Sequence, residues 1–225
     1  MRGLTPELHL LREDAGGRVV VLTLNRPEKR NALSFELRDA LADELERDAG
    51  AFVITGAGSA FCAGMDVTQF GGDAANRARI VATSTRLFRA LALCPAPVVA
   101  FVNGPALAGG FALALFCDVR FAAPEATFGF VEVARGIPAS YAAARAALPE
   151  GVARDLCLSG RVIDAEEAQR LGVARAGSLD DALAAARAAA TPAGRATKAR
   201  ALLQPAWLPL LEEEERALRA AVADR

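Results

Sequence analysis

Residues 94–117 read CPAPVVAFVNGPALAGGFALALFC, a run of 24 residues without a formal charge. A run of this length could cross a bilayer as a helix. Prolines and glycines interrupt it, however, and each proline removes a backbone hydrogen bond that lipid cannot replace. The run is therefore predicted to hold a buried strand, Val98–Val102, then a turn at Gly109 and a buried helix, Phe111–Phe116. No membrane segment is expected.

On either side of this stretch, strands and helices alternate along the chain. Leucines recur every four residues from Leu33 to Leu45 behind Ser34, which predicts an N-capped helix reaching about Asp48. The other expected elements are a hairpin of residues 8–11 and 19–24 around the turn 14–17, strands at 51–55 and 119–122, a helix at 76–93, and mostly helical chain from 151 onward, including an alanine-rich stretch at 181–191 and a charged segment at 210–224. This alternation is typical of an α/β domain.

The composition excludes several classes of function. The chain has 225 residues, 53% of them hydrophobic, which is enough for one folded core. Its net charge of −1 offers no field for a nucleic acid. A single histidine, His9, argues against a serine-protease triad or a two-histidine metal site, and no metal is expected. Four cysteines without a CxxC pair predict free thiols in a reducing cytoplasm.

Residues 56–61 begin like a dinucleotide fingerprint, but Phe61 stands in place of the third glycine, so no NAD site is expected.

Two glycine-bearing turns are candidates for binding an anion. Residues 60–66 and 103–111 each follow a predicted buried strand. Backbone N–H groups left unpaired at such turns can bind an anion. The simpler interpretation, that both are tight turns without a ligand, stays open.

Five ordered blocks of sequence resemble the crotonase (enoyl-CoA hydratase/isomerase) superfamily. The blocks are Asn25–Leu33, Thr55–Gly56 with Ala60–Asp66, Val102–Gly104 with Ala108–Gly110, Cys117–Asp118, and Ser159–Ala168. The resemblance covers about residues 8–175. It implies an α/β spiral of ββα units over residues 1–175, followed by a shortened helical segment, 176–225, for oligomerisation and active-site cover. A homotrimer or a dimer of trimers is implied as well.

The resemblance also implies a substrate class and a set of site residues. Acyl thioesters of coenzyme A are the expected ligands, with coenzyme A or phosphopantetheine as part of the substrate and no separate cofactor. The backbone N–H groups of Met65 and Gly109 would form the oxyanion hole. The residues expected to contact substrate or coenzyme A are Arg26, Arg30, Ala32, Ala63, Gly64, Met65, Asp66, Val67, Gly109 and Gly110.

The chain departs from the hydratases of this family at one acid position. Hydratases hold a water with two glutamates; the first falls at Ala112 here and the second at Glu132. One carboxyl group in apolar surroundings would have a raised pKa and could carry a proton between carbons, which favours double-bond isomerisation by Glu132. Ser140 and Tyr141 could hydrogen-bond the acyl group or simply begin a helix, and Asp118 is expected to be a cap or an ion-pair partner.

The end of the chain departs from the family as well. Many relatives continue into a segment whose phenylalanine and basic residue cover the adenosine end of coenzyme A. Part of this cover is expected to be absent here, unless Arg26, Lys29, Arg30 or Lys198 replaces it. A carrier protein that presents the acyl group on phosphopantetheine would need no such cover. Hydration, dehydration or decarboxylation of that acyl group stays open, as do a non-catalytic acyl-CoA-binding protein and a structural subunit.

Overall fold

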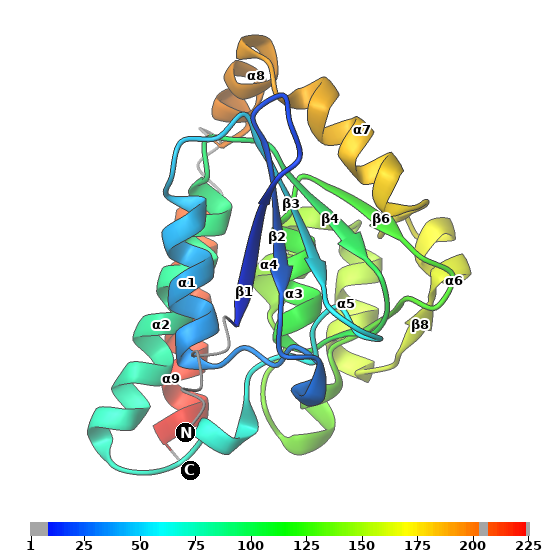
Figure 1. Ribbon diagram of the computed structural model, residues 1–225. Coiled ribbons are helices and arrows are strands. Elements are labelled where there is room, and N and C mark those ends of the chain that lie inside the picture. Colours follow the sequence, from blue (N-terminus) through cyan, green and yellow to red (C-terminus); the bar gives the residue numbers. More distant parts are fainter. Residues whose placement is uncertain (1–8, 203–206, 224–225) are drawn as a thin grey trace, which may run out of the picture.

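The computed structural model describes residues 9–202 and 207–223. A six-stranded sheet forms its centre, in the order β1-β2-β3-β4-β6-β9 (Figure 1). β1 pairs antiparallel with β2 and the remaining pairs are parallel. The strands are β1 (Leu10–Asp14), β2 (Val19–Leu24), β3 (Ala51–Gly56), β4 (Val98–Val102), β6 (Val119–Ala122) and β9 (Arg175–Ala176).

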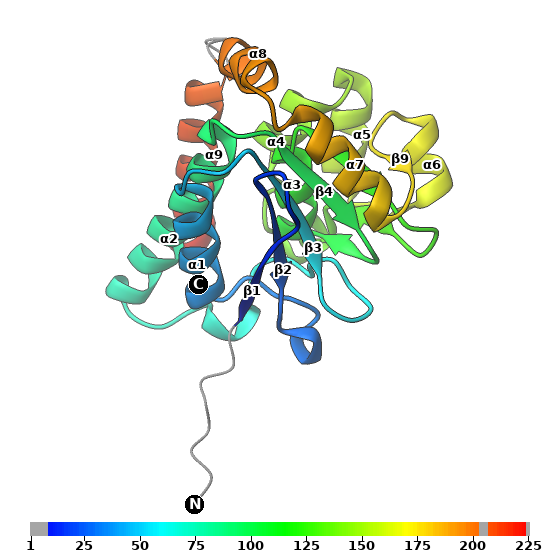
Figure 2. The same ribbon diagram turned by 45° about the horizontal axis from the view of Figure 1, so that its top comes forward.

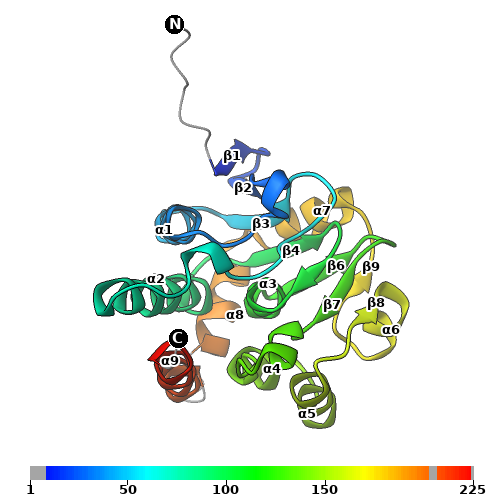
Figure 3. The same cartoon turned by 90° about the horizontal axis from the view of Figure 1, so that it is seen from below.

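Alternate residues of these strands enter two separate hydrophobic cores. Val20 and Leu22 of β2 belong to the larger core, whereas Val19 and Val21 belong to the smaller one. Helix α7 (Leu179–Ala189) covers the smaller core, and α1 (Phe35–Leu45) and α3 (Gly109–Phe116) contribute to the larger core on the opposite face (Figure 3). Burial on both faces explains why β2, β3 and β4 are almost continuously apolar.

A second sheet of three short strands lies beside α3. It consists of β5 (Ala106–Leu107), β7 (Thr127–Gly129) and β8 (Ile163–Asp164), with β5 parallel and β8 antiparallel to β7. The Phe111 ring on α3 packs on Phe128 and Phe130, with centroid distances of 5.5 and 4.7 Å. These contacts fix the first turn of α3 against the second sheet.

The expected elements form where the residues were predicted to place them. Ser34 caps α1, its Oγ accepting a hydrogen bond from the Leu37 N–H at 3.3 Å. That helix ends at Leu45, before the expected Asp48. The strand Val98–Val102 and the helix through Phe116 are confirmed. In the predicted hairpin, residue 8 lies outside the described residues, and the two strands pair as β1 and β2.

The remaining helices surround these sheets. They are α2 (Ala74–Leu93), α4 (Tyr141–Ala147), α5 (Glu150–Ser159), α6 (Ala165–Arg170), α8 (Pro192–Leu202) and α9 (Trp207–Ala223), with short 3-10 turns η1 (Pro27–Lys29), η2 (Val67–Gln69) and η3 (Val131–Arg135). Helix α9 packs along α2 and against α4 (Figure 2). The last helix therefore returns to the elements that follow β3 and β7.

An ion pair between a buried lysine and a partly exposed aspartate ties α8 to the central sheet. Lys198 Nζ lies 2.7 Å from Asp118 Oδ2 and donates to the Ala96 carbonyl oxygen at 2.8 Å. The same carboxylate oxygen accepts the Val98 N–H at 2.7 Å. Asp118 is thus the expected ion-pair partner. Within residues 9–202 and 207–223, no helix combines the length and apolar character needed to cross a membrane.

Candidate active site

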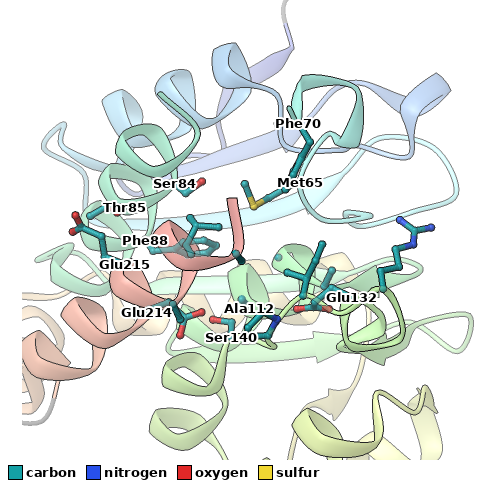
Figure 4. A pocket seen from close by; sticks show the side chains of 18 of the residues that line it. Met65, Phe70, Ser84, Thr85, Phe88, Ala112, Glu132, Ser140, Glu214 and Glu215 are labelled. Carbon is teal, nitrogen blue, oxygen red and sulfur yellow. The ribbon is translucent and has the colours of Figure 1, made fainter. Parts of the chain in front are cut away.

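A largely apolar pocket lies between α2, α3, η3 and α9 (Figure 4). Of the residues predicted from the sequence, it is lined by Ala63, Met65, Val67, Gly109 and Glu132. The apolar wall includes Phe70 and Phe88, together with Leu211 and Leu218 from α9. The two glycine-bearing turns and the predicted acid/base residue therefore meet in one cavity.

The backbone amides of Met65 and Gly109 lie next to each other at the pocket wall. A Cβ built on Gly109 would be 3.7 Å from the Met65 nitrogen, and a Cβ on Gly64 would be 3.2 Å from the Gly109 nitrogen. Neither amide donates a hydrogen bond to any residue that the structure describes. Backbone N–H groups away from water usually have a partner, and these two have none among the described residues. Both are therefore available to an acceptor in the pocket.

Unusual backbone conformations bring these amides together. Ala108, just before Gly109, has φ +51° and ψ −126°, a region that residues with a Cβ rarely adopt. Its N–H donates to the Gly129 carbonyl at 2.8 Å, which anchors the strained residue to β7. Gly110 has no room for a side chain, because a Cβ there would lie 2.1 Å from the Cys62 carbonyl oxygen. Strain and close packing together set the position of the turn.

Glu132 enters the pocket from η3. Its Oε2 is buried and has no hydrogen-bond partner among the described residues. Burial raises the pKa of Glu132 to about 7, its own backbone N–H opposes this, and the nearby Glu214 charge raises it further. A carboxyl group with such a pKa is present in both protonation states near neutral pH, as an acid/base group must be.

The position opposite Glu132 on α3 carries no acid. Ala112 is fully buried and lines the pocket with its methyl group. Ser140, at the N-terminus of α4, also lines the pocket, and its buried hydroxyl neither caps the helix nor finds another partner among the described residues. Tyr141 lies outside the lining and interacts with Arg154. Of the two predicted candidates, only Ser140 faces the cavity.

A second carboxyl group, not predicted from the sequence, lies in the pocket. Glu214, on α9, lines the same cavity as Glu132 and accepts the Ala142 N–H at 3.3 Å through Oε2. Burial raises the pKa of Glu214, while the Ser140 hydroxyl nearby and the Ala142 amide act in the opposite direction. In the sequence this residue is one of four consecutive glutamates, 212–215, and only a heptad-like amphipathic pattern could have singled it out.

Two of the residues predicted to contact the substrate pair with each other. Arg26 and Asp66 form a buried ion pair, Nη1 to Oδ2 at 2.9 Å, and Arg26 also donates to the Ala32 carbonyl at 2.6 Å. Burial would raise the pKa of Asp66, but Thr68 and Arg26 outweigh it and lower that pKa. Arg30 is exposed, and its carbonyl accepts the Ala63 N–H at 2.9 Å.

The cysteines and the histidine do not line the pocket. The four cysteines are free and buried, and burial raises the pKa of Cys62 to about 12, so none is a ready nucleophile. His9 does not line the pocket. Among the described residues no cluster of histidine, cysteine and carboxylate side chains could hold a metal ion.

Comparisons with known proteins find a matching family model and several relatives. A family model described as enoyl-CoA hydratase/isomerase matches residues 14–201. A Thermus thermophilus protein whose name proposes an enoyl-CoA hydratase is 42% identical over 170 residues, which are 70% of this chain and 66% of that protein, just under two thirds of its length. A Mycobacterium tuberculosis protein with a similar name is 38% identical over 216 residues, covering 87% of this chain and 83% of that protein.

The fold is also that of a solved structure. The crystal structure of an enoyl-CoA hydratase from Mycobacterium avium subsp. paratuberculosis matches with a TM-score of 0.83 at 28% identity, over 97% of this chain and 95% of the other. The expected α/β spiral with C-terminal helices is confirmed by this likeness. The expected trimer stays a prediction.

Proposed function

The chain belongs to the enoyl-CoA hydratase/isomerase family, and we propose that it shifts the double bond of an enoyl thioester bound in the pocket between α3, η3 and α9. One observation carries this proposal. A buried carboxyl oxygen of Glu132 without a partner among the described residues shares an apolar pocket with two amides that have no acceptor there. These groups are what an enolate and a mobile proton require.

The two amides would stabilise the charge that develops on the thioester oxygen. Removing a proton from the carbon next to the thioester carbonyl places negative charge on that oxygen. The N–H groups of Met65 and Gly109 are fixed in place before the reaction, so they need no reorganisation as the charge forms. Losing one such donor typically slows a reaction by ~10²–10³-fold.

Glu132 would carry the proton. With a 3-enoyl thioester, its carboxylate takes a proton from C2, and the electrons spread over a dienolate. A proton returned to C4 then leaves the double bond between C2 and C3, so no water is consumed and no group is lost. A pKa of about 7 suits Glu132 to both steps near neutral pH.

Hydration is the second candidate, because the pocket holds a second carboxyl group. The absence of an acid at Ala112 argued against two carboxylates activating a water, but Glu214 enters the same pocket from α9. Two carboxyl groups could hold and activate a water between them. The reaction assay must therefore distinguish added water from a moved double bond.

We propose that the acyl group arrives on coenzyme A or on the phosphopantetheine of a carrier protein. Lys198 cannot cover an adenosine end, because it is buried against Asp118. Arg30 remains exposed near the loop that carries Ala63. Binding of free acyl-CoA at low micromolar concentration, with no response to acyl-carrier protein, would assign coenzyme A as the carrier. The reverse preference would assign the carrier protein.

The reaction is tested by incubating the protein with 2-enoyl and 3-enoyl thioesters in heavy water. Products are followed by mass spectrometry, with the Glu132→Gln variant as control. We expect interconversion of the isomers with deuterium on carbon and without the mass of an added water. A hydrated product as the main species would contradict isomerisation and select the second candidate. Stabilisation by acyl-CoA without turnover, equal in the variant, would indicate a non-catalytic binding protein.

A further inference from the structure

Glu214 differs from its three glutamate neighbours on α9 in where its side chain lies. Glu212 and Glu213 are exposed, whereas Glu214 lines the pocket (Figure 4). Glu215 also reaches the rim but pairs with Arg219 at 2.6 Å. Within the part of the chain that the structure describes, Glu214 alone of these four accepts a hydrogen bond from another helix, at the Ala142 N–H of α4.

The packing of α9 fixes this position. Leu211, one turn before Glu214, is 4% exposed, and Leu218, one turn after it, packs with a hydrophobic cluster that includes Ile80 and Val81 of α2. Residues spaced at three and four positions share one face of a helix. Glu214 therefore belongs to the face that α9 turns towards α2 and α4, where a carboxyl group is costly unless it has a use.

Two carboxyl groups in one apolar cavity influence each other's protonation. The charge of Glu214 raises the pKa of Glu132, and burial raises that of Glu214 as well. Ionising both at once is unfavourable, and a proton held by two such groups belongs to the pair rather than to one of them. A cavity in this state holds one base and one acid together.

We infer that Glu214 is a second acid/base group of this site, supplying from α9 the carboxyl group that α3 lacks at Ala112. The inference rests on the proposed function and adds a second proton carrier to it. In the form of the pair that carries its proton on Glu214, Glu132 takes the proton from C2 and Glu214 gives a different proton to C4. The pair is reset when a proton passes from Glu132 to solvent and another returns to Glu214, so the total number of protons is unchanged. Ser140, whose buried hydroxyl faces the cavity, lies beside Glu214 for this exchange.

The origin of the proton on C4 tests this inference in the unmodified protein. A 3-enoyl thioester is converted in heavy water, and the deuterium at C4 of the product is measured by NMR in single-turnover conditions. Two carriers predict close to one solvent deuterium at C4 per turnover. A C4 hydrogen that comes from C2 of the same substrate molecule would overturn the inference.

Glu214→Gln and Glu213→Gln form a matched pair on the same helix. Glutamine keeps an oxygen for the Ala142 N–H, so α9 should stay in place, which a thermal melt checks. We expect Glu214→Gln to lower kcat by ~10²-fold or more with KM changed only a few-fold, and to reduce the deuterium at C4. Glu213→Gln, exposed, should match the unmodified protein. Equal kcat and equal labelling in the two variants would overturn the inference while leaving the proposed function intact; an unmodified protein that converts no thioester would overturn the proposed function itself.

Discussion

Replacing Gly109 by alanine is expected to fill the oxyanion hole without disturbing the fold. The added Cβ would sit 3.7 Å from the Met65 nitrogen and 3.7 Å from Met65 Cγ, both ordinary contact distances. An oxygen that accepts a hydrogen bond from the Met65 N–H lies about 2.9 Å from that nitrogen. The methyl group and the thioester oxygen would therefore compete for the space beside the two amides.

The expected loss of activity is that of one blocked hydrogen bond, because both N–H groups remain but the methyl group keeps the thioester oxygen from the Met65 N–H. One lost donor corresponds to ~10²–10³-fold in kcat, or about 2.7–4 kcal/mol of transition-state stabilisation. The free energy of unfolding should hardly fall, because position 109 is the first residue of α3 and alanine is a better helix former than glycine. Steady-state kinetics with an enoyl thioester and urea denaturation measure the two effects separately.

Gly110→Ala provides the contrast. Its Cβ would lie 2.1 Å from the Cys62 carbonyl oxygen, so this variant should lose stability first and activity as a consequence. If Gly109→Ala kept its activity within a few-fold, or lost activity only in proportion to lost folding, the assignment of the oxyanion hole to the space beside the Met65 and Gly109 amides would be refuted.

Three further predictions concern the carboxyl groups and two ion pairs. Glu132→Gln should lower kcat by ~10²–10⁴-fold. Burial raises the pKa of Glu132 to about 7, so ionising this group lowers the free energy of unfolding by about 3 kcal/mol as pH rises from 4.5 towards 7. In urea denaturation, Glu132→Gln should therefore show a weaker dependence of unfolding free energy on pH over this range. The same pH dependence in both proteins would contradict the raised pKa. Arg26→Ala leaves Asp66 buried without its cation, so the free energy of unfolding should fall by about 3 kcal/mol. Activity should fall too, because Asp66 adjoins Met65. An unchanged urea midpoint would show that the ion pair does not stabilise the fold. Lys198→Ala removes the contact of α8 with Asp118, so the free energy of unfolding should fall by about 2–3 kcal/mol while kcat at 25 °C stays near that of the unmodified protein. A large fall in kcat without loss of stability would show that Lys198 has a role at the site.

Local patterns account for the elements that the sequence predicted well. The Ser34 cap and the leucine period are contained in residues 33–45, so α1 needs no distant partner to be recognised. The continuous apolar run Val98–Val102 is what a strand buried on both faces requires. The strands β5 and β8 hold two residues each, too few to show an apolar run that would predict them from the sequence.

The site was predicted only in the part that local sequence encodes. The glycine-bearing turns could be recognised in the chain, and they do meet in the pocket. Glu214 could not be placed there, because its position depends on how α9 packs against α2 and α4. The positive φ of Ala108 had no signal either, since alanine favours negative φ. The ion pair between Arg26 and Asp66 could not be predicted from the sequence, because the two residues lie far apart in the chain; contact of Arg26 with coenzyme A stays a prediction.

A structure of the protein with a bound unreactive acyl thioester would show directly whether the two amides hold the thioester oxygen beside Glu132. The thioester oxygen should lie about 3 Å from both the Met65 and the Gly109 nitrogen, with the Glu132 carboxyl group in contact with C2 or C4 of the acyl chain. A thioester oxygen bound away from either amide, or an acyl chain that leaves Glu132 without contact, would contradict the account.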